Sequence, residues 1–367
     1  MSRFVMVWLV VLGCQDEEVE VTLQQVSAVT YNVGLAPNYV SYAEERQPFV
    51  IDALLQTDAD VVCLNEVWMA DDIDAVLAAT ESVFPYEFHE YTQEEGLKEP
   101  ACTDKETAPL VVCTEKYCSD TEDLVGCVFA NCGDEFYAMS AECRGCAAAN
   151  VDLDDVDAIV EACLSGGGTL TYGGHNGLML LSRQPLEDTA HQEFQSWLTQ
   201  RAVLSARMGD AQIACTHLAS DLSEPTYESD FASSYEEEQA MQIDALLTWF
   251  DTRVGDGPGI LLGDFNTGPA TTTGIEAELV DNWQMLADAG WQDANLAQKQ
   301  PFCTWCNDNT LTGAGVESII DHVLVINATT DNPVRLFDEK VTIETDDGPS
   351  EVSLSDHYGV SATISFE

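Results

Sequence analysis

The sequence predicts an α/β protein, because short apolar runs that are typical of buried strands alternate with stretches of helical periodicity. The runs are rich in Val and Ile and are bounded by Gly, Asn or Asp, as expected of buried strands. Strands are expected at 26–30, 61–64, 178–181, 213–215, 260–262 and 319–320. Apolar residues recur with a period of 3.6 at 46–57, 72–80 and 236–251, which predicts helices. Strands that alternate with helices in this way indicate an α/β fold.

The composition predicts a folded chain with a very acidic surface. The 367 residues include 65 Asp plus Glu against 13 Lys plus Arg, a formal net charge of -52. Hydrophobic residues make up 46% of the chain, which is enough to bury a large core, so disorder is not expected. The closest two basic residues, Arg335 and Lys340, are five positions apart. Because holding many phosphates requires clustered Lys and Arg, we expect no stable complex with nucleic acid.

The N-terminus predicts export. A basic residue precedes nine apolar residues, too few to span a bilayer as a helix, as in an export signal. The run Val11-Leu12-Gly13-Cys14 resembles the lipobox of bacterial lipoproteins. We therefore expect residues 1–13 to be removed, Cys14 to be lipidated and 14–21 to form an acidic tether. The lipid would anchor the protein to a membrane, facing the periplasm or the cell surface. With an ordinary signal peptide, Cys14 would have no role and the protein would be secreted.

A segment rich in cysteine interrupts the alternation of strands and helices. Eight cysteines fall between Cys102 and Cys163. In an exported protein eight such cysteines are expected to form four disulfides, although their pairing cannot be read from the spacing. We interpret 93–168 as a partly helical, disulfide-rich insertion, and 22–92 with 169–367 as the main domain.

Four cysteines lie in the predicted main domain. Cys63 and Cys215 sit inside apolar, strand-like runs and are expected to be buried thiols with a packing role. Cys303-Thr-Trp-Cys306 is a C-x-x-C motif, and with Cys143-Arg-Gly-Cys146 it could build a four-thiolate zinc site. Export favours disulfides over zinc for these cysteines.

Polar side chains of catalytic type follow several predicted strands. Asp264 and Asn266 follow a buried run, and residues two apart on a strand point to one face, so the two are expected to share a site. The alternative is a turn in which Asp and Asn bond their own backbone. Near the C-terminus, Ser355-Asp356-His357 places a carboxylate beside an imidazole. Each of these motifs alone is ambiguous.

Seven motifs of this kind occur in a characteristic order along the chain. They are Thr30-Tyr-Asn-Val33, Leu64-Asn-Glu-Val67, Asn176-Gly177 through Leu181-Ser-Arg-Gln-Pro185, Thr216-His-Leu218, Gly263-Asp-Phe-Asn266, Ile320-Asp-His322 and Ser355-Asp-His357. The ordered set resembles the endonuclease/exonuclease/phosphatase superfamily, the deoxyribonuclease I-like metal-dependent phosphoesterases. The resemblance covers roughly 21–92 and 169–367. It implies a four-layer α/β/β/α sandwich with the site at one end of the two packed sheets.

The resemblance also implies a metal site. Glu66 would be the principal ligand, with Asn32 close by and Asp356 completing the metal side. Carboxylate and amide oxygens select Mg²⁺, Mn²⁺ or Ca²⁺ over zinc. The cation would neutralise charge during hydrolysis of a phosphoester.

The same resemblance implies catalytic roles for five residues. Asp264 would deprotonate the attacking water, and Asn266 would hold the phosphate or the water. His217 would protonate the leaving oxygen. His357 would contact the phosphate and stay cationic because of Asp321. For His89, His191 and His322 we expect structural roles.

Three features favour a lipid head group as the substrate: the absence of a basic patch, the predicted export, and the style of two motifs. The stretch 175–186 and the Thr304-Trp305 pair resemble the neutral sphingomyelinase branch, in which His175 and Asn176 would bind substrate. Cys306 departs from this branch, which usually carries acidic and proline residues there. The alternatives are a secreted deoxyribonuclease I-like nuclease, another phosphoesterase, and a catalytically silent surface-binding protein. The acidity could equally be an adaptation to salt.

Overall fold

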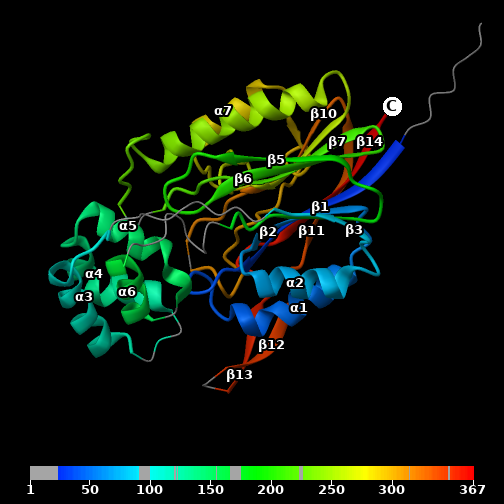
Figure 1. Ribbon diagram of the computed structural model, residues 1–367. Helices are drawn as coiled ribbons and strands as arrows, with labels where there is room; N and C mark the ends of the chain where they lie inside the picture. The colour runs from blue at the N-terminus through cyan, green and yellow to red at the C-terminus, as the bar shows by residue number, and fades with distance from the viewer. Residues whose placement is uncertain are drawn as a thin grey trace, which may run out of the picture.

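Two six-stranded β-sheets pack face to face, and helices cover their outer faces (Figure 1). The computed structural model describes residues 24–90, 100–119, 121, 123–153, 155–165, 175–222, 226–313, 315–345 and 348–367. The first sheet has the order β11-β14-β1-β2-β4-β3, and the second sheet has the order β5-β6-β7-β8-β10-β9. This arrangement confirms the predicted four-layer α/β/β/α sandwich.

The strands of each sheet come from distant parts of the chain. The first sheet contains β1 (Gln24–Leu35), β2 (Val61–Val67), β3 (Tyr86–Phe88), β4 (Met179–Ser182), β11 (Thr329–Leu336) and β14 (Gly359–Phe366). The second sheet contains β5 (Glu187–Phe194), β6 (Arg201–Met208), β7 (Ala211–His217), β8 (Gly259–Asp264), β9 (Gln292–Asp293) and β10 (Asp321–Ile326). A separate hairpin is formed by β12 (Lys340–Thr345) and β13 (Gly348–Ser353). Strand β10 begins just after the predicted run 319–320, so its first residue is the acidic Asp321.

Three hydrophobic layers hold the sandwich together. The inner layer lies between the sheets and includes Ala28 of β1 and Ile213 of β7. Side chains alternate along a strand, so the next residues, Val29 and Ala214, pack outward against the helices. Strands that are buried on both faces need apolar residues at almost every position. This explains why the sequence shows continuous apolar runs there.

Four helices form the outer layers. Helices α1 (Ala43–Leu55) and α2 (Ala70–Thr80) pack on the first sheet, and α7 (Tyr235–Val254) and α8 (Val280–Asp288) pack on the second. The helices predicted at 46–57, 72–80 and 236–251 correspond to α1, α2 and α7. Within the described ranges, every helix is too short or too polar to cross a bilayer.

The cysteine-rich segment forms a helical unit at one end of the sandwich (Figure 1). It contains α3 (Asp104–Tyr117), α4 (Leu124–Tyr137), α5 (Ala141–Ala149), the 3₁₀ helix η1 (Val151–Leu153) and α6 (Val156–Ser165). Its eight cysteines form the expected four disulfides: Cys102–Cys143, Cys113–Cys132, Cys118–Cys127 and Cys146–Cys163. The predicted insertion limits at 93 and 168 lie outside the described residues. The predicted export signal, Cys14 and the tether also lie outside them.

The four cysteines of the main domain also form disulfides. Cys63 and Cys215 are not free thiols but form a buried disulfide, with Cα atoms 5.4 Å apart. The prediction was wrong because both side chains point into the inner layer, where β2 and β7 face each other across the two sheets. Cys303 and Cys306 also form a disulfide, which confirms the preference for disulfides over a zinc site.

Candidate active site

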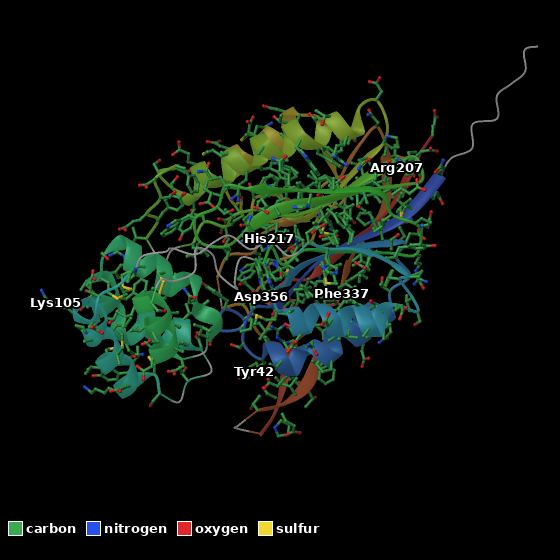
Figure 2. The ribbon with its side chains drawn as sticks, in the orientation of Figure 1. Tyr42, Lys105, Arg207, His217, Phe337 and Asp356 are labelled. Atoms are coloured by element: carbon green, nitrogen blue, oxygen red, sulfur yellow. A yellow bond between two sulfur atoms is a disulfide. The ribbon has the colours of Figure 1, made fainter. Side chains whose placement is uncertain are left out.

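A cleft of about 280 Å³ opens at one end of the two sheets, and several of the predicted site residues line it. Figure 2 shows His217 and Asp356 at the end of the sandwich that faces the insertion. Six of the predicted residues line the cleft: Glu66, His217, Asp264, Asn266, Asp356 and His357. Residues far apart in the sequence therefore meet at one surface.

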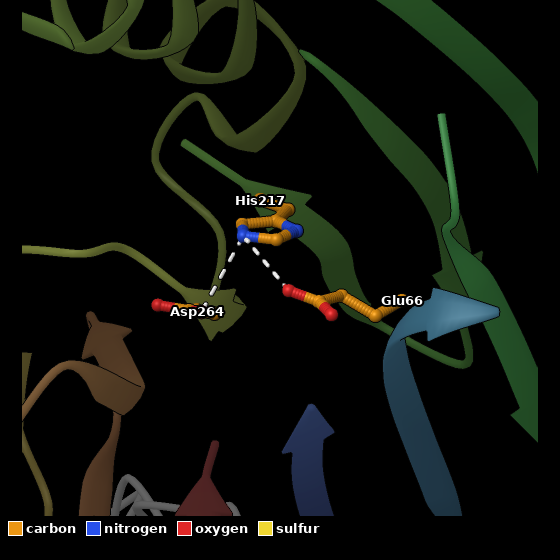
Figure 3. A group of neighbouring side chains, drawn as sticks. All are labelled: Glu66, His217 and Asp264. Carbon is orange, nitrogen blue, oxygen red and sulfur yellow. Dashed lines mark ion pairs between the residues drawn. The ribbon is translucent and has the colours of Figure 1, made fainter. Parts of the chain in front are cut away.

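The sheet register brings the catalytic side chains together. Strands β7 and β8 are parallel neighbours, and His217 pairs with Asp264 at their carboxyl ends. Strand β10 runs antiparallel to β8, so its first residue, Asp321, also lies opposite Asp264. Glu66 reaches the same place from β2 in the other sheet (Figure 3). Its φ of 62° is uncommon for a residue other than glycine, and such conformations cluster at functional sites.

Asn32 links the carboxylates of the two sheets. Its Nδ2 donates to Glu66 Oε1 at 3.0 Å and to Asp264 Oδ2 at 2.9 Å. Its Oδ1 accepts a hydrogen bond from the backbone N–H of Gly34 at 3.0 Å, and this fixes which way the amide faces. In this structure Asn32 therefore positions the carboxylates through its nitrogen. Its oxygen faces away from them, and its ligand role stays a prediction.

His217 lies between the two carboxylates. Its Nε2 is 3.4 Å from Asp264 Oδ2 and 4.0 Å from Glu66 Oε1. The same Nε2 is 3.2 Å from Asn266 Nδ2, an amide nitrogen that can only donate. Burial, together with Arg201 and His357, lowers the pKa of His217 well below its ordinary value. His217 is thus a neutral imidazole in the free protein.

His357 has the opposite electrostatic environment. Burial alone would lower the pKa of His357, but Asp321, Asp264 and Asp356 together raise it well above its ordinary value. Its Nδ1 lies 2.9 Å from Asp321 Oδ2, as in the expected ion pair. His357 therefore carries a positive charge beside the cleft.

Asn266 joins the site through a turn as well as through its side chain. It has a left-handed φ of 49°, and its backbone N–H donates to Asp264 Oδ1 at 2.9 Å. Its Nδ2 also donates to the carbonyl of Leu218 at 3.1 Å. For Asp264 and Asn266, a turn and a shared site were alternative predictions, and the structure contains both.

The negative groups of the cleft fit a divalent cation. Burial and Asp321 raise the pKa of Asp264 to about 7, against the opposing effect of His357. Burial and Asp356 likewise raise the pKa of Glu66. The ligand atoms of Glu66, His217 and Asp264 lie within 4.8 Å of one another, and the two carboxylates are the oxygen donors of this group. A bound cation would relieve the repulsion among these carboxylates, and oxygen-rich donors suit Mg²⁺, Mn²⁺ or Ca²⁺.

Asp356, the third predicted metal residue, lies against the backbone of β1. Its Oδ1 accepts a hydrogen bond from the Ser355 hydroxyl at 3.0 Å. A Cβ on Gly34 would lie 2.7 Å from that oxygen, so glycine leaves room for the carboxylate.

Arg46 holds the segment before Asp356 against β1. It is fully buried and donates hydrogen bonds to the carbonyls of Val33 in β1 and of Leu354.

The two predicted substrate-binding residues, His175 and Asn176, contact the backbone of neighbouring segments. His175 Nδ1 lies 2.8 Å from the carbonyl oxygen of Trp68, and Asn176 Oδ1 accepts from the N–H of Leu178 at 3.0 Å. Gly177 has a φ of 69°, and a Cβ there would come within 2.8 Å of the Trp68 ring. Among the described residues that line the cleft, Trp68 is present whereas His175 and Asn176 are not. Their role in binding substrate stays a prediction.

Two site residues were missed by sequence reasoning. Arg201 lines the cleft, and its Nε and Nη1 are buried without a hydrogen-bond partner among the described residues. Asn65 is fully buried and bridges the sheets, donating to the Thr216 carbonyl at 2.8 Å and accepting from Asp264 N at 3.2 Å. Two features of the sequence could have pointed to them: Arg201 is a basic residue at the start of an apolar strand, and Asn65 is an amide inside one.

The three remaining histidines lie outside the described lining of the cleft. His322 is buried, with Nδ1 2.8 Å from Asp293 Oδ2 and Nε2 2.8 Å from the Thr267 carbonyl oxygen. His89 Nε2 lies 3.6 Å from Glu87 Oε2, and His191 Nδ1 lies 3.9 Å from Glu90 Oε1. These contacts agree with structural roles.

Three solved structures share this fold at low sequence identity. An endonuclease/exonuclease/phosphatase from Beutenbergia cavernae aligns with 15% identity and a TM-score of 0.53, covering 93% of this chain and 72% of that one. Sphingomyelinase C from Streptomyces griseocarneus has 15% identity and a TM-score of 0.53, covering 94% and 100%. A beta toxin mutant from Staphylococcus aureus with bound magnesium ions has 13% identity and a TM-score of 0.54, covering 92% and 99%. At these identities the likeness establishes the fold alone.

Sequence comparison identifies the family. Among curated proteins, none matches this chain. Residues 29–357, by contrast, match the Endonuclease/Exonuclease/phosphatase family. The match spans all seven motifs and agrees with the sandwich and with the carboxylates and histidines of the cleft. The chain belongs to the endonuclease/exonuclease/phosphatase family, whose members are metal-dependent hydrolases of phosphoester bonds.

Proposed function

We propose that the protein is a phospholipase C that cleaves sphingomyelin-like phosphodiesters. The observation that carries the proposal is that the cleft is lined by apolar side chains as well as by the catalytic groups. The apolar and aromatic lining residues include Tyr39, Val40, Trp68, Leu198 and Leu222. Arg201 is the one Lys or Arg among the described lining residues. A nucleic-acid strand would therefore have few basic side chains to neutralise its phosphates.

The aromatic residues also suit the head group. Tyr39, Trp68 and Trp305 line the cleft near its carboxylates. Aromatic faces attract quaternary ammonium ions such as choline. A zwitterionic head group would therefore place its phosphate near Arg201 and its cationic end near aromatic and acidic groups.

The chain's own residues could carry out the hydrolysis as follows. A bound Mg²⁺ would supply a positive charge that stabilises the phosphoryl oxygens. Asp264, with its raised pKa, would accept a proton from water as the water attacks phosphorus. The cationic His357 and Arg201 would hold the phosphate oxygens. The bond between phosphorus and the lipid oxygen then breaks.

His217 must gain a proton before it can protonate the leaving oxygen. It is neutral in the free protein because of burial and nearby positive charge. A bound phosphodiester brings a negative charge, which raises the pKa of a nearby imidazole. The substrate itself would thus prepare His217 for the proton transfer.

Export and a lipid anchor at Cys14 remain part of this proposal. They are supported by the apolar N-terminal run and the Val11-Leu12-Gly13-Cys14 sequence. An anchor would place the cleft near membrane lipids. A Cys14→Ser variant that still partitions with membranes would contradict the anchor and leave the catalytic proposal standing.

A substrate panel tests the proposed activity. Purified protein would be assayed on sphingomyelin, phosphatidylcholine, linear DNA and supercoiled plasmid DNA, with Mg²⁺ and with chelator. We expect release of phosphocholine that requires Mg²⁺ and that falls roughly 10²- to 10⁴-fold in Asp264→Asn. Plasmid cleavage at a rate comparable to phosphocholine release would instead favour a nuclease.

A further inference from the structure

We propose that the helical insertion contains the binding site for an alkyl chain of the substrate. The site is an apolar pocket of about 60 Å³ lined mainly by residues of the insertion helices. This inference rests on the proposed function, because it treats the substrate as a phosphodiester with a hydrocarbon tail. It assigns a role to a segment that the catalytic cleft alone leaves unexplained.

The walls of the pocket suit a hydrocarbon. Side chains from four helices face it, including Leu110, Val128, Ala147 and Ile159. Thr107 and Tyr39 carry the only side-chain hydroxyls among the described lining residues, and none of these residues is charged. A buried water needs two to four polar partners, whereas an apolar cavity stays dry and accepts apolar guests. The pocket is therefore better suited to methylene groups than to water.

The pocket adjoins the catalytic cleft. Tyr39 lines both spaces, so the pocket and the cleft are neighbours. Val125 and Val151 line the pocket and pack with Val40 and Trp68, which line the cleft. A molecule with its phosphate in the cleft could thus extend its tail along a continuous apolar surface.

The insertion is held in place beside the cleft. Asn38 Nδ2 donates to the carbonyl of Val151 at 2.8 Å, next to Tyr39 in the sequence. On another side, Arg144 pairs with Glu228, which belongs to the main domain. Cys143 and Cys163, which line the pocket, are both in disulfides. These links keep the pocket close to the head-group site.

The volume of the pocket limits the length of alkyl chain that it can bind without rearrangement. Its free volume admits a few methylene groups, and a longer chain would have to displace a side chain. Met139 lines the pocket, and its unbranched thioether is the kind of side chain that adapts most readily. The chain-length dependence of binding is therefore the property to measure.

Calorimetry with a homologous series tests the pocket without depending on turnover. The probes are phosphocholine and its ethyl, butyl, hexyl and octyl esters, all used as monomers with the full chain in Mg²⁺. We expect the dissociation constant to fall roughly fourfold for each methylene that is buried, until the pocket is full. The heat capacity change should become more negative along the series, as burial of apolar surface requires.

A filled pocket provides the critical variant. Ala147→Phe should abolish the gain with chain length while leaving phosphocholine binding unchanged. The matched control is Ala130→Phe on the exposed side of α4, which should behave like the wild type. If Ala147→Phe fails to fold by circular dichroism, Ile159→Ala replaces it, and the enlarged pocket should shift saturation to longer chains.

The outcomes separate the two proposals. Affinity that is independent of chain length, or unaffected by both pocket variants, would overturn the alkyl site and make the pocket a closed core. Chain-dependent binding without Mg²⁺-dependent hydrolysis of any ester would retain the alkyl site and remove the proposed activity. Hydrolysis whose rate follows the binding series would support both.

Discussion

Cys63 and Cys215 form a disulfide that joins the two β-sheets directly beneath the candidate active site, with their Cα atoms 5.4 Å apart. Cys63 lies three residues before Glu66, and Cys215 lies two residues before His217. The bond is fully buried in the inner layer. It therefore connects β2, which carries Glu66, to β7, which carries His217.

Removing this disulfide should destabilise the protein strongly. The bond closes a loop with a sequence separation of 152, and long loops give the largest entropic stabilisation. For Cys63→Ala/Cys215→Ala we expect a loss of about 2–5 kcal/mol in the free energy of unfolding, measured by urea titration. The control pair Cys303→Ala/Cys306→Ala, with a sequence separation of 3, should lose less. Equal midpoints for both variants would contradict this expectation.

The site was predictable where its signals are local, and not where they depend on how the sheets meet. Asp264 and His217 follow apolar runs, so their place at strand ends could be expected from sequence. The partner of Cys63 could not, because periodicity shows that a side chain points inward but not which strand faces it. Arg201 was missed for a related reason, since a single basic residue before a strand has no distinctive spacing. The neutral state of His217 depends on burial and on charges from distant segments.

The stability of the protein should depend on pH through His322. The Asp293 carboxylate and the Thr267 carbonyl can only accept hydrogen bonds, so both ring nitrogens of His322 donate and the ring is cationic. Burial alone would lower the pKa of His322, but Asp293 raises it above the ordinary value of 6.5. A raised pKa gives stability that is fully present below pH 6.5 and is lost as pH rises through the folded-state pKa.

This dependence can be measured by urea unfolding between pH 6 and pH 9. The wild type should lose free energy of unfolding over this range relative to the variant Asp293→Asn/His322→Gln, which lacks the titrating pair. His191→Gln provides a control, because His191 is exposed and its Nδ1 lies 3.9 Å from the Glu90 carboxylate. Parallel stability curves for the wild type and the double variant would argue against a cationic His322.

Glu66→Gln should distinguish the role of Glu66 in metal binding from its repulsion with Asp356 in the metal-free protein. Burial and the neighbouring Asp356 raise the pKa of Glu66, so a neutral amide should leave the metal-free protein as stable as the wild type or more stable. Mg²⁺ should raise the melting temperature of the wild type, because a ligand that binds only the folded state stabilises it. The variant should lose most of this increase. Glu87→Gln, at an exposed residue outside the described lining of the cleft, should keep it.

Arg201→Met should weaken substrate binding more than it weakens folding. The Arg201 guanidinium is buried at the cleft, and two of its nitrogens have no hydrogen-bond partner among the described residues. Burial lowers its pKa despite the nearby Glu66 and Asp264. A substrate phosphate would give these nitrogens charged acceptors, and such hydrogen bonds contribute about 1.5–3 kcal/mol. We therefore expect kcat/KM to fall by roughly 10- to 150-fold, mostly through KM.

The same strand offers a matched control for Arg201. Arg207 lies toward the other end of β6 (Figure 2), where it is partly exposed and pairs with Glu187 and Asp188. Arg207→Met should leave kcat/KM unchanged, because surface ion pairs contribute little and the cleft is far along the strand. Michaelis constants for a soluble phosphocholine ester, measured with Mg²⁺, compare the two variants. If both lower kcat/KM equally, the effect comes from disturbing β6, and Arg201 does not bind the phosphate.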